Sequence, residues 1–309
     1  MQPPTIQQIE SEGLTWINVI KTGPDEMKHL EETYGFHPLH LADCLSPAQK
    51  PKLDYGENYL FLVLLFPVYR RKTREIVSTE VDFFIGSNFL VTVHNNELPP
   101  LINFFNICQI SSSQQKKYFT ENPAHLLYEI LNKLLFYCTP ILDTLQYSLS
   151  SLEYNIFRGY ERRMVREILV IKRSIINFRR IVQVHRTVIY KFIRQTKKFF
   201  SLGELRPYFE DLIEIANEIW DNLENMRQTS EALEQTNNAL ISFRMNDIIK
   251  ILTIISVIIL PLGLLANIFG MSLKYIPLAS HPAAFWIILG ILIVTFVGLF
   301  SFFKKKRWL

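Results

Sequence analysis

Two stretches near the C-terminus contain only uncharged, mostly apolar residues. They are residues 251–269 and 285–303, and each is 19 residues long. An α-helix rises 1.5 Å per residue, so about 20 residues cross a hydrocarbon core of about 30 Å. A pair of buried helices in a soluble protein is the alternative, but such helices seldom contain two charge-free runs of this length. The pattern therefore predicts two transmembrane helices.

Positive charges flank both predicted spans. Arg244 and Lys250 precede the first span, and residues 304–307 (KKKR) follow the second. Because positive charge marks the cytoplasmic side, we expect both flanks in the cytoplasm and the loop 270–284 outside. The first ten residues, MQPPTIQQIE, have neither the basic nor the apolar part of a signal peptide. We therefore expect a protein of the inner or plasma membrane, with both termini cytoplasmic.

The first 110 residues alternate between short β-rich and short helical patterns. Runs rich in β-branched and aromatic residues, bounded by turn residues, indicate strands, and Gly86-Ser87-Asn88 suits a hairpin turn. The predicted elements are strands at 14–20, 59–69, 76–85 and 89–94 and helices at 24–34 and 38–45. Residues 111–117 (SSSQQKK) are interpreted as a polar linker. The pattern predicts a cytosolic α/β domain over residues 1–120.

From Pro123 onward the pattern is helical. Gly159 is expected to separate helices of about 121–158 and 161–200, which form a hairpin over residues 121–206. From Pro207 an apolar stripe with steps of three and four runs without a stop signal into the first span. A helix of 63 residues reaches roughly 95 Å, and it needs other helices or copies of itself to cover the stripe. The remaining predicted segments are a stalk at 207–250, spans at 251–269 and 285–303, the loop 270–284 and the tail 304–309.

Composition argues against several classes of protein. The 309 residues are 49% hydrophobic and 20% charged, and the basic tail largely accounts for the net charge of +4. That charge does not argue for nucleic-acid binding. Three scattered cysteines, Cys44, Cys108 and Cys138, favour reduced thiols over disulfides. We find no glycine-rich phosphate loop and no nucleophile–base constellation, so we expect neither an enzyme nor an organic cofactor.

Three stretches of the chain carry a resemblance to a known family. They are FHPLHLADCLSPAQKPKLDYGENYLFLVL (36–64), RMNDIIKILTIISVIILPLGLLANIFGMS (244–272) and FFKKKRWL (302–309). Together they resemble the CorA family of divalent-cation transporters over essentially the whole chain. The resemblance implies a funnel-shaped homopentamer in a lipid bilayer, with the first span lining a passive central pore. It implies Mg²⁺ as first substrate, Co²⁺, Ni²⁺ and Zn²⁺ as further candidates, and a divalent cation as regulator.

The pore exit departs from the family pattern. The family motif Gly-Met-Asn is replaced here by Gly270, Met271 and Ser272, and the acidic loop carries Lys274. The loop landmarks are kept, namely Tyr275 and Pro277. Lys274 either lines the mouth, where it repels cations, or extends sideways to lipid headgroups. These departures leave an alternative open, a less selective ion channel or a weakly conducting membrane sensor.

One face of the first span is interpreted as the pore face. Its positions follow steps of three and four, and apolar residues alternate with small or polar ones. They are Ile249, Leu252, Ser256, Leu260, Gly263 and Asn267. A lone amide in an apolar span is costly unless it meets water or a partner. Asn267 therefore either supplies the amide ring that Ser272 no longer provides or bonds to a neighbouring helix. The spans contain no titrating group for proton coupling; His281 in the loop is the nearest candidate.

The resemblance also implies a regulatory cation site. Asp211, in the sequence YFED, matches a family carboxylate between neighbouring cytosolic domains, and Glu80 and Asp82 are candidate partners. A solvated charged face is the alternative for each. A second group has zinc-like spacing but fits an ordinary helix followed by Pro-Lys-Leu. Its members are His37, His40, Asp43 and Cys44.

Overall fold

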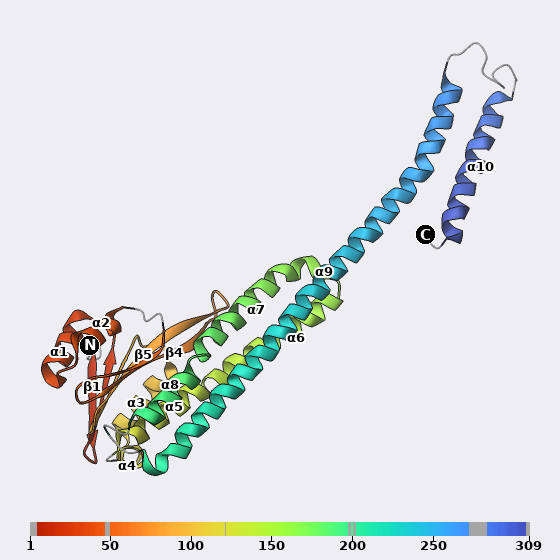
Figure 1. Ribbon diagram of the computed structural model, residues 1–309. Helices are drawn as coiled ribbons and strands as arrows, with labels where there is room; N and C mark the ends of the chain where they lie inside the picture. The colour runs from red at the N-terminus through yellow and green to blue at the C-terminus, as the bar shows by residue number, and fades with distance from the viewer. Residues whose placement is uncertain are drawn as a thin grey trace. The chain divides into compact units, whose positions relative to one another are not determined.

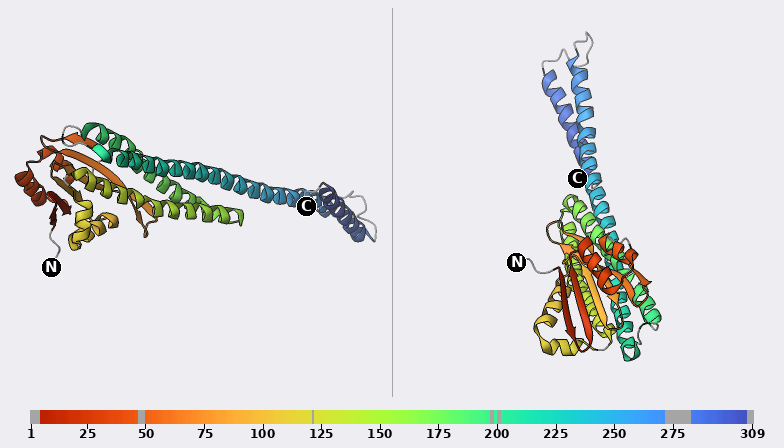
Figure 2. Two further views of the ribbon diagram at one scale, coloured as in Figure 1. Left: turned by 90° about the horizontal axis from the view of Figure 1, so that it is seen from below. Right: turned by 90° about the vertical axis from the view of Figure 1, so that its left-hand side faces the viewer.

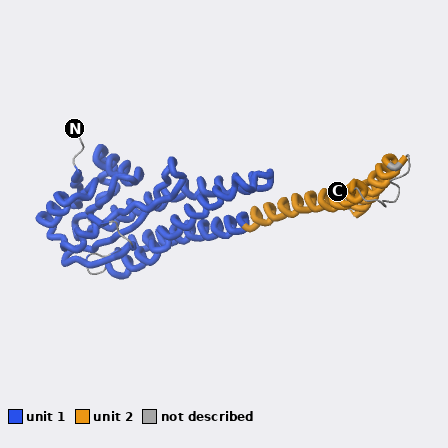
Figure 3. Tube along the Cα trace, turned by 90° about the horizontal axis from the view of Figure 1, so that it is seen from above, with its two compact units in different colours: residues 1–234 blue, residues 235–309 orange. Residues whose placement is uncertain are grey.

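The computed structural model describes residues 5–46, 50–120, 122–196, 199, 202–271 and 283–306. The chain divides into two compact units, residues 1–234 and 235–309 (Figure 3). The first unit contains the β-sheet and most of the helices. The second contains the two charge-free segments.

A six-stranded mixed sheet forms the framework of the first unit (Figure 1). Its order is β1-β2-β6-β5-β4-β3; β2 and β6 pair in parallel and the other neighbours are antiparallel. The strands are β1 Ile6–Ser11, β2 Leu14–Ile20, β3 Lys52–Tyr55, β4 Leu60–Arg70, β5 Glu75–Ile85 and β6 Phe89–His94. The four predicted strands are present. The two edge strands, β1 and β3, were missed because both are short and mostly polar.

Two short helices, α1 (Pro24–Tyr34) and α2 (Pro38–Leu45), cover one face of the sheet. Each begins with proline, whose fixed φ and missing N–H suit the first helical position. Their apolar side chains join inward-facing strand residues in a single buried cluster. In this cluster Phe36 stacks on Phe84 with ring centroids 4.2 Å apart.

Aromatic residues pack around Trp16 of β2. Its indole lies 4.9 Å from Phe105, measured between ring centroids, and its N–H donates to the Thr92 hydroxyl at 3.1 Å. Phe105 belongs to α3 (Pro99–Ile110), and α4 (Ser112–Tyr118) follows it. Residues 111–117 are therefore not a linker, because glutamine and lysine favour helix and the buried Tyr118 anchors the segment.

The two long helices expected over 121–158 and 161–200 are four shorter ones. They are α5 (Pro123–Phe136), α6 (Cys138–Phe157), α7 (Glu161–Val182) and α8 (His185–Gln195). A continuous helix through residue 137 is prevented by Pro140, which cannot donate to the carbonyl of Phe136 and clashes with it. At the second break, the buried His185 side chain donates to the Leu65 carbonyl at 2.6 Å.

Helix α9 extends without a break from Arg206 to Gly270, as the stripe predicts. In the first unit it lies antiparallel to α7 and beside the α6–α7 hairpin (Figure 2). Buried residues such as Leu212 and Leu223 face the neighbouring helices. Ion pairs flank them, with N···O distances of 2.9 Å for Arg179–Glu224 and 2.7 Å for Lys172–Glu234.

The second unit consists of the C-terminal part of α9 and helix α10 (Ala284–Lys305). Both contain segments long and apolar enough to cross a membrane. Their contact is small, since its buried residues are Ile254, Ile258 and Phe303, with Leu262 and Leu299 packed against them.

Candidate ion path and cation site

The predicted pore stripe lies on an uncovered face of α9. Ile249, Leu252 and Leu260 are 52%, 58% and 71% exposed. Ser256 and Asn267 are also exposed, and Gly263 is half-buried. These values describe one chain, and they identify the face that remains available to lipid, water or another copy.

Helix α10 packs on nearly the opposite side of α9. Ile254 and Ile258 meet Phe303 there. At about 100° per residue, the centre of the stripe is rotated by about 160° from the centre of this contact. The second span therefore covers one side of α9 and leaves the polar-and-apolar side open.

The polar groups of the stripe differ in their hydrogen bonding. The Ser256 hydroxyl donates to the Leu252 carbonyl at 2.9 Å, so its oxygen lone pairs remain as acceptors. The Asn267 amide makes no hydrogen bond with any described residue of its own chain. An amide at this depth therefore requires water or another chain as its partner.

The helix ends at the predicted exit motif. Gly270 is the last residue of α9, and the N–H of Met271 donates to the Ile268 carbonyl at 3.4 Å. Ser272, Lys274, Tyr275, Pro277 and His281 lie outside the described residues.

Glu80 and Asp82 line one pocket in the first unit. They are two residues apart on β5 and therefore point to the same face of the sheet. The pocket has a volume of about 330 Å³. Its polar lining residues include Thr22, Cys44, Ser46, Ser78, Thr79, Asn95 and Glu97. Asp82 is only 2% exposed, and its Oδ1 has no hydrogen-bond partner among the described residues.

Burial raises the pKa of Asp82 well above its usual range. The nearby charge of Glu80 and a hydrogen bond between the two carboxyl groups raise it further, and a hydrogen bond with Cys44 opposes the shift. The two carboxyl groups thus favour sharing a proton, because two like charges at this separation repel in a poorly hydrated site. A bound divalent cation relieves the same repulsion and can replace that proton.

Asp211 does not line this pocket. It is exposed near the start of α9, close to the Tyr128 ring. Burial raises the pKa of Tyr128, and the charges of Glu129 and Asp211 add to that shift. Within one chain the structure brings Glu80 and Asp82 together but does not bring Asp211 into their pocket.

Sequence reasoning placed Cys44 in a different group and missed its contact with Asp82. The thiol comes from α2 and the carboxylate from β5, so no local spacing connects them. Burial raises the pKa of the Cys44 thiol, and the charge of Asp82 contributes. The zinc-spaced side chains have other contacts: His37 accepts from the Leu39 N–H, and His40 is 2.9 Å from the Tyr59 hydroxyl. In the described part of the chain, no three or more His, Cys, Asp or Glu residues are grouped to hold a metal ion.

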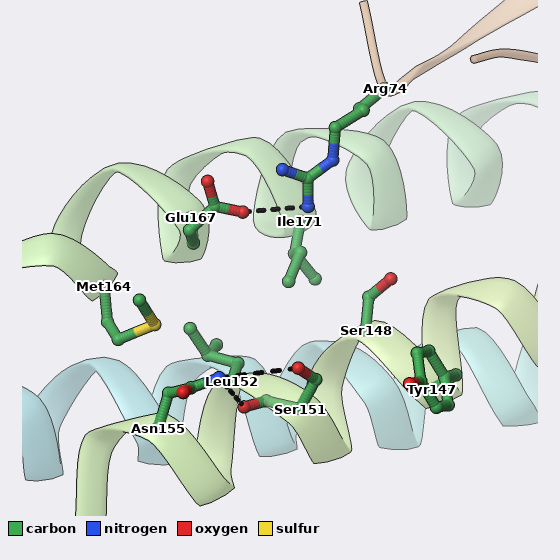
Figure 4. A pocket seen from close by; sticks show the side chains of 9 residues that line it. All are labelled: Arg74, Tyr147, Ser148, Ser151, Leu152, Asn155, Met164, Glu167 and Ile171. Carbon is green, nitrogen blue, oxygen red and sulfur yellow. Dashed lines mark hydrogen bonds and ion pairs between the residues drawn. The ribbon is translucent and has the colours of Figure 1, made fainter. Parts of the chain in front are cut away.

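A second pocket, of about 230 Å³, lies between α6 and α7 (Figure 4). Its charged lining residues are Arg74 and Glu167, which pair with an N···O distance of 2.8 Å. None of the predicted site residues lines it.

Comparison with known proteins gives a consistent family assignment. A model of the family described as CorA-like Mg²⁺ transporter protein matches residues 11–305. The cobalt/magnesium transport protein CorA of Thermotoga maritima is 27% identical over 304 residues, covering 97% of this chain and 85% of the relative. The CorA of Methanocaldococcus jannaschii is 25% identical over 308 residues, covering 99% and 95%. The complete structure of the CorA magnesium transporter from M. jannaschii matches 97% of this chain and 93% of that chain, with a TM-score of 0.84 and 23% identity.

Proposed function

The chain belongs to the family of CorA-like Mg²⁺ transporter proteins, and on this premise we propose that it carries Mg²⁺ across the cell membrane. It is a membrane protein with two spans and an α/β domain in the cytoplasm. Co²⁺ is a second substrate candidate, because relatives along nearly the whole chain are named cobalt/magnesium transport proteins. Inward movement of a divalent cation down a 100 mV potential releases about 4.6 kcal/mol, so passive flux suffices.

The uncovered face of α9 is the observation that carries this proposal. Helix α10 packs against Ile254 and Ile258 and leaves the face of Ser256 and Asn267 open. Five copies arranged around an axis, with these faces inward, enclose a path in which water meets polar groups. The α10 helices then lie on the outside, toward lipid.

The stripe residues have different roles in this path. Ile249, Leu252 and Leu260 form apolar constrictions, which close when they dewet. Ser256 and Asn267 accept hydrogen bonds from water on a hydrated ion, which suits Mg²⁺ because it keeps its water shell. Gly263 leaves room between the rings, and Gly270, Met271 and Ser272 form the exit beside the loop of Lys274, Tyr275 and Pro277.

Regulation is proposed to occur at the carboxylates of the first unit. Glu80 and Asp82 offer two carboxyl groups in one pocket, and Asp211 of a neighbouring copy is the proposed third group. Cytoplasmic Mg²⁺ bound there joins neighbouring domains and favours a closed path. Loss of the ion restores repulsion and loosens the ring.

Ion flux into liposomes tests the transport proposal. The full chain should pass Mg²⁺ and Co²⁺, and internal Mg²⁺ should reduce the flux. Flux of monovalent ions at a similar rate would instead favour the less selective channel suggested by Ser272 and Lys274. An absence of all ion flux would favour the weakly conducting sensor.

The Asn267→Ala substitution tests the path itself. We expect Mg²⁺ flux to fall about tenfold, the change expected if one hydrogen-bonded contact of about 1.4 kcal/mol is lost from the barrier region. Thr295→Ala is the matched control, because this α10 hydroxyl is exposed and already donates to the Ile291 carbonyl. Equal flux in the two variants would remove Asn267 from the path.

A further inference from the structure

The tip of the α6–α7 hairpin, residues 154–166, exposes four arginines. They are Arg158, Arg162, Arg163 and Arg166. The only acidic residue in this segment is Glu161, which is buried. None of the ion pairs in the described part of the chain involves these four guanidinium groups. The tip therefore presents an uncompensated positive charge to its surroundings.

The same tip exposes aromatic side chains. Tyr154, Phe157 and Tyr160 are 57%, 66% and 47% exposed. Arg158 stacks over Tyr154, with its guanidinium carbon 4.7 Å from the ring centroid, and Arg163 lies 5.8 Å from the Tyr160 centroid. Exposed apolar rings beside cations are costly in bulk water, but both suit the layer of lipid headgroups, where amphipathic rings accumulate.

The tip lies at the end of the first unit from which the chain continues toward the membrane. Helix α7 is antiparallel to α9, with Arg186 near Asn217, Arg179 paired with Glu224 and Lys172 paired with Glu234. From Lys172 back to the start of α7 the helix extends by another 16 Å or so, at 1.5 Å per residue. Glu234 is the last residue of this unit, and only residues 235–250 separate it from the first predicted span.

We propose that the tip of the α6–α7 hairpin docks on the anionic lipid headgroups of the cytoplasmic leaflet. The arginines pair with lipid phosphates, for which the planar guanidinium is well suited. Phe157 and the two tyrosines enter the headgroup layer. The contact links the cytosolic domain to the membrane surface independently of the spans.

The alternative partner is a second copy of the chain. Exposed carboxylates on α9, such as Glu214 and Glu218, offer opposite charge. Lipid is favoured because the exposed rings accompany the arginines at one tip, whereas a pairing of charged helix faces does not require them. Because the chain is already held in the membrane, lipid phosphates are also present at high local concentration.

Fluorescence quenching in reconstituted full-length protein tests this inference. Val165 is 43% exposed and lies between two of the arginines, and the three native cysteines are buried. A Val165→Cys protein is labelled with a fluorophore and placed in vesicles that carry a headgroup-attached quencher. We expect quenching to rise at least twofold when about a third of the phosphatidylcholine is replaced by phosphatidylglycerol. The rise should vanish in 0.5 M NaCl, because salt screens exposed charges.

Two charge-matched variants separate docking from general electrostatics. The tip variant combines R158Q, R162Q, R163Q and R166Q. The control variant combines K28Q, R180Q, K191Q and R194Q, four exposed cations elsewhere in the first unit. Arg194 stacks on Tyr190 as Arg158 stacks on Tyr154. The tip variant should lose the lipid-dependent rise, and the control variant should keep it.

Three outcomes would overturn the proposal. They are equal quenching in neutral and anionic vesicles, equal loss in both variants, and a fluorophore protected from quenchers in both the lipid and the aqueous phase. The last result would place the tip against another copy. An unchanged melting temperature of the tip variant confirms that its fold is intact. Mg²⁺ flux is measured in parallel, so failure of docking remains distinct from failure of transport.

Discussion

The two units of this chain bury their apolar residues to very different degrees. In the first unit, the strands and helices enclose a continuous core with side chains such as Trp16 and Phe84 that have no exposed surface. In the second unit, the described buried apolar residues are Ile254, Ile258 and Phe303. Most other apolar side chains of the spans are exposed.

The difference reflects the solvent for which each unit is built. In water, burial of apolar area stabilises the fold by about 25 cal/mol per Å². In lipid, apolar surface gains little from contact with another helix, so association depends on close packing and polar contacts. The first unit is therefore expected to be stabilised within one chain, whereas the spans depend on lipid and on other copies.

The largest predicted effect compares the same substitution in the two units. Ile17→Ala removes a side chain that is 1% exposed, and the resulting cavity should cost about 2–5 kcal/mol. Ile258→Ala, at a position 8% exposed, should cost clearly less because lipid can fill the space. Thermal unfolding of the full chain in lipid nanodiscs, followed by circular dichroism, measures both. Equal shifts in melting temperature would contradict the distinction.

A second prediction concerns the buried carboxyl group of Asp82. Its pKa is raised in the folded state, so its stabilising contribution is complete below the unfolded pKa of about 3.9 and is lost as pH rises through the folded pKa. Asp82→Asn should remove this loss. Relative to wild type, the variant should become more stable with rising pH, by up to about 1.4 kcal/mol for each unit of pKa shift.

Denaturant unfolding at a series of pH values between 4 and 8 measures this difference. Glu97→Gln is a suitable control, because this residue lines the same pocket and is paired with Arg70 at 3.4 Å. Parallel stability curves for wild type and Asp82→Asn would show that the buried carboxyl group does not titrate differently on folding.

The smallest predicted effect concerns the ion pairs beside α9. Lys172 and Glu234 are 29% and 34% exposed, and Lys172→Met should cost about 0.5–1 kcal/mol. Arg173 pairs with Glu75 but is 70% exposed, so Arg173→Met should change the stability by less than about 0.5 kcal/mol. A loss comparable to that of Ile17→Ala would mean that charge pairing, and not apolar burial, dominates this part of the first unit.

Local pattern was sufficient for most elements but not for their ends. The strands around Gly86-Ser87-Asn88 and the long helix to Gly270 were predicted because their patterns are strong and continuous. The break at Tyr137 was missed because the effect of Pro140 was read as compatible with a longer helix. Helix α4 was missed because a polar composition was given more weight than helix propensity and the buried Tyr118.

The candidate site was only partly accessible from the sequence. The stripe from Ile249 to Asn267 follows from helical periodicity. Its position opposite the contact with α10 could not be predicted, because that depends on which side of α9 receives the second helix. The shared face of Glu80 and Asp82 follows from strand alternation, but the approach of Cys44 depends on how α2 packs on the sheet.

The sequence by itself determined the membrane spans, the single long helix and the family, because uninterrupted runs and helical periodicity act over neighbouring residues. Only the tertiary structure decided which face of α9 stays uncovered, which carboxyl group is buried and where the arginine-rich tip lies. Those properties arise from contacts between segments far apart in the chain. Burial and charge at such contacts depend on packing in three dimensions, which no local pattern specifies.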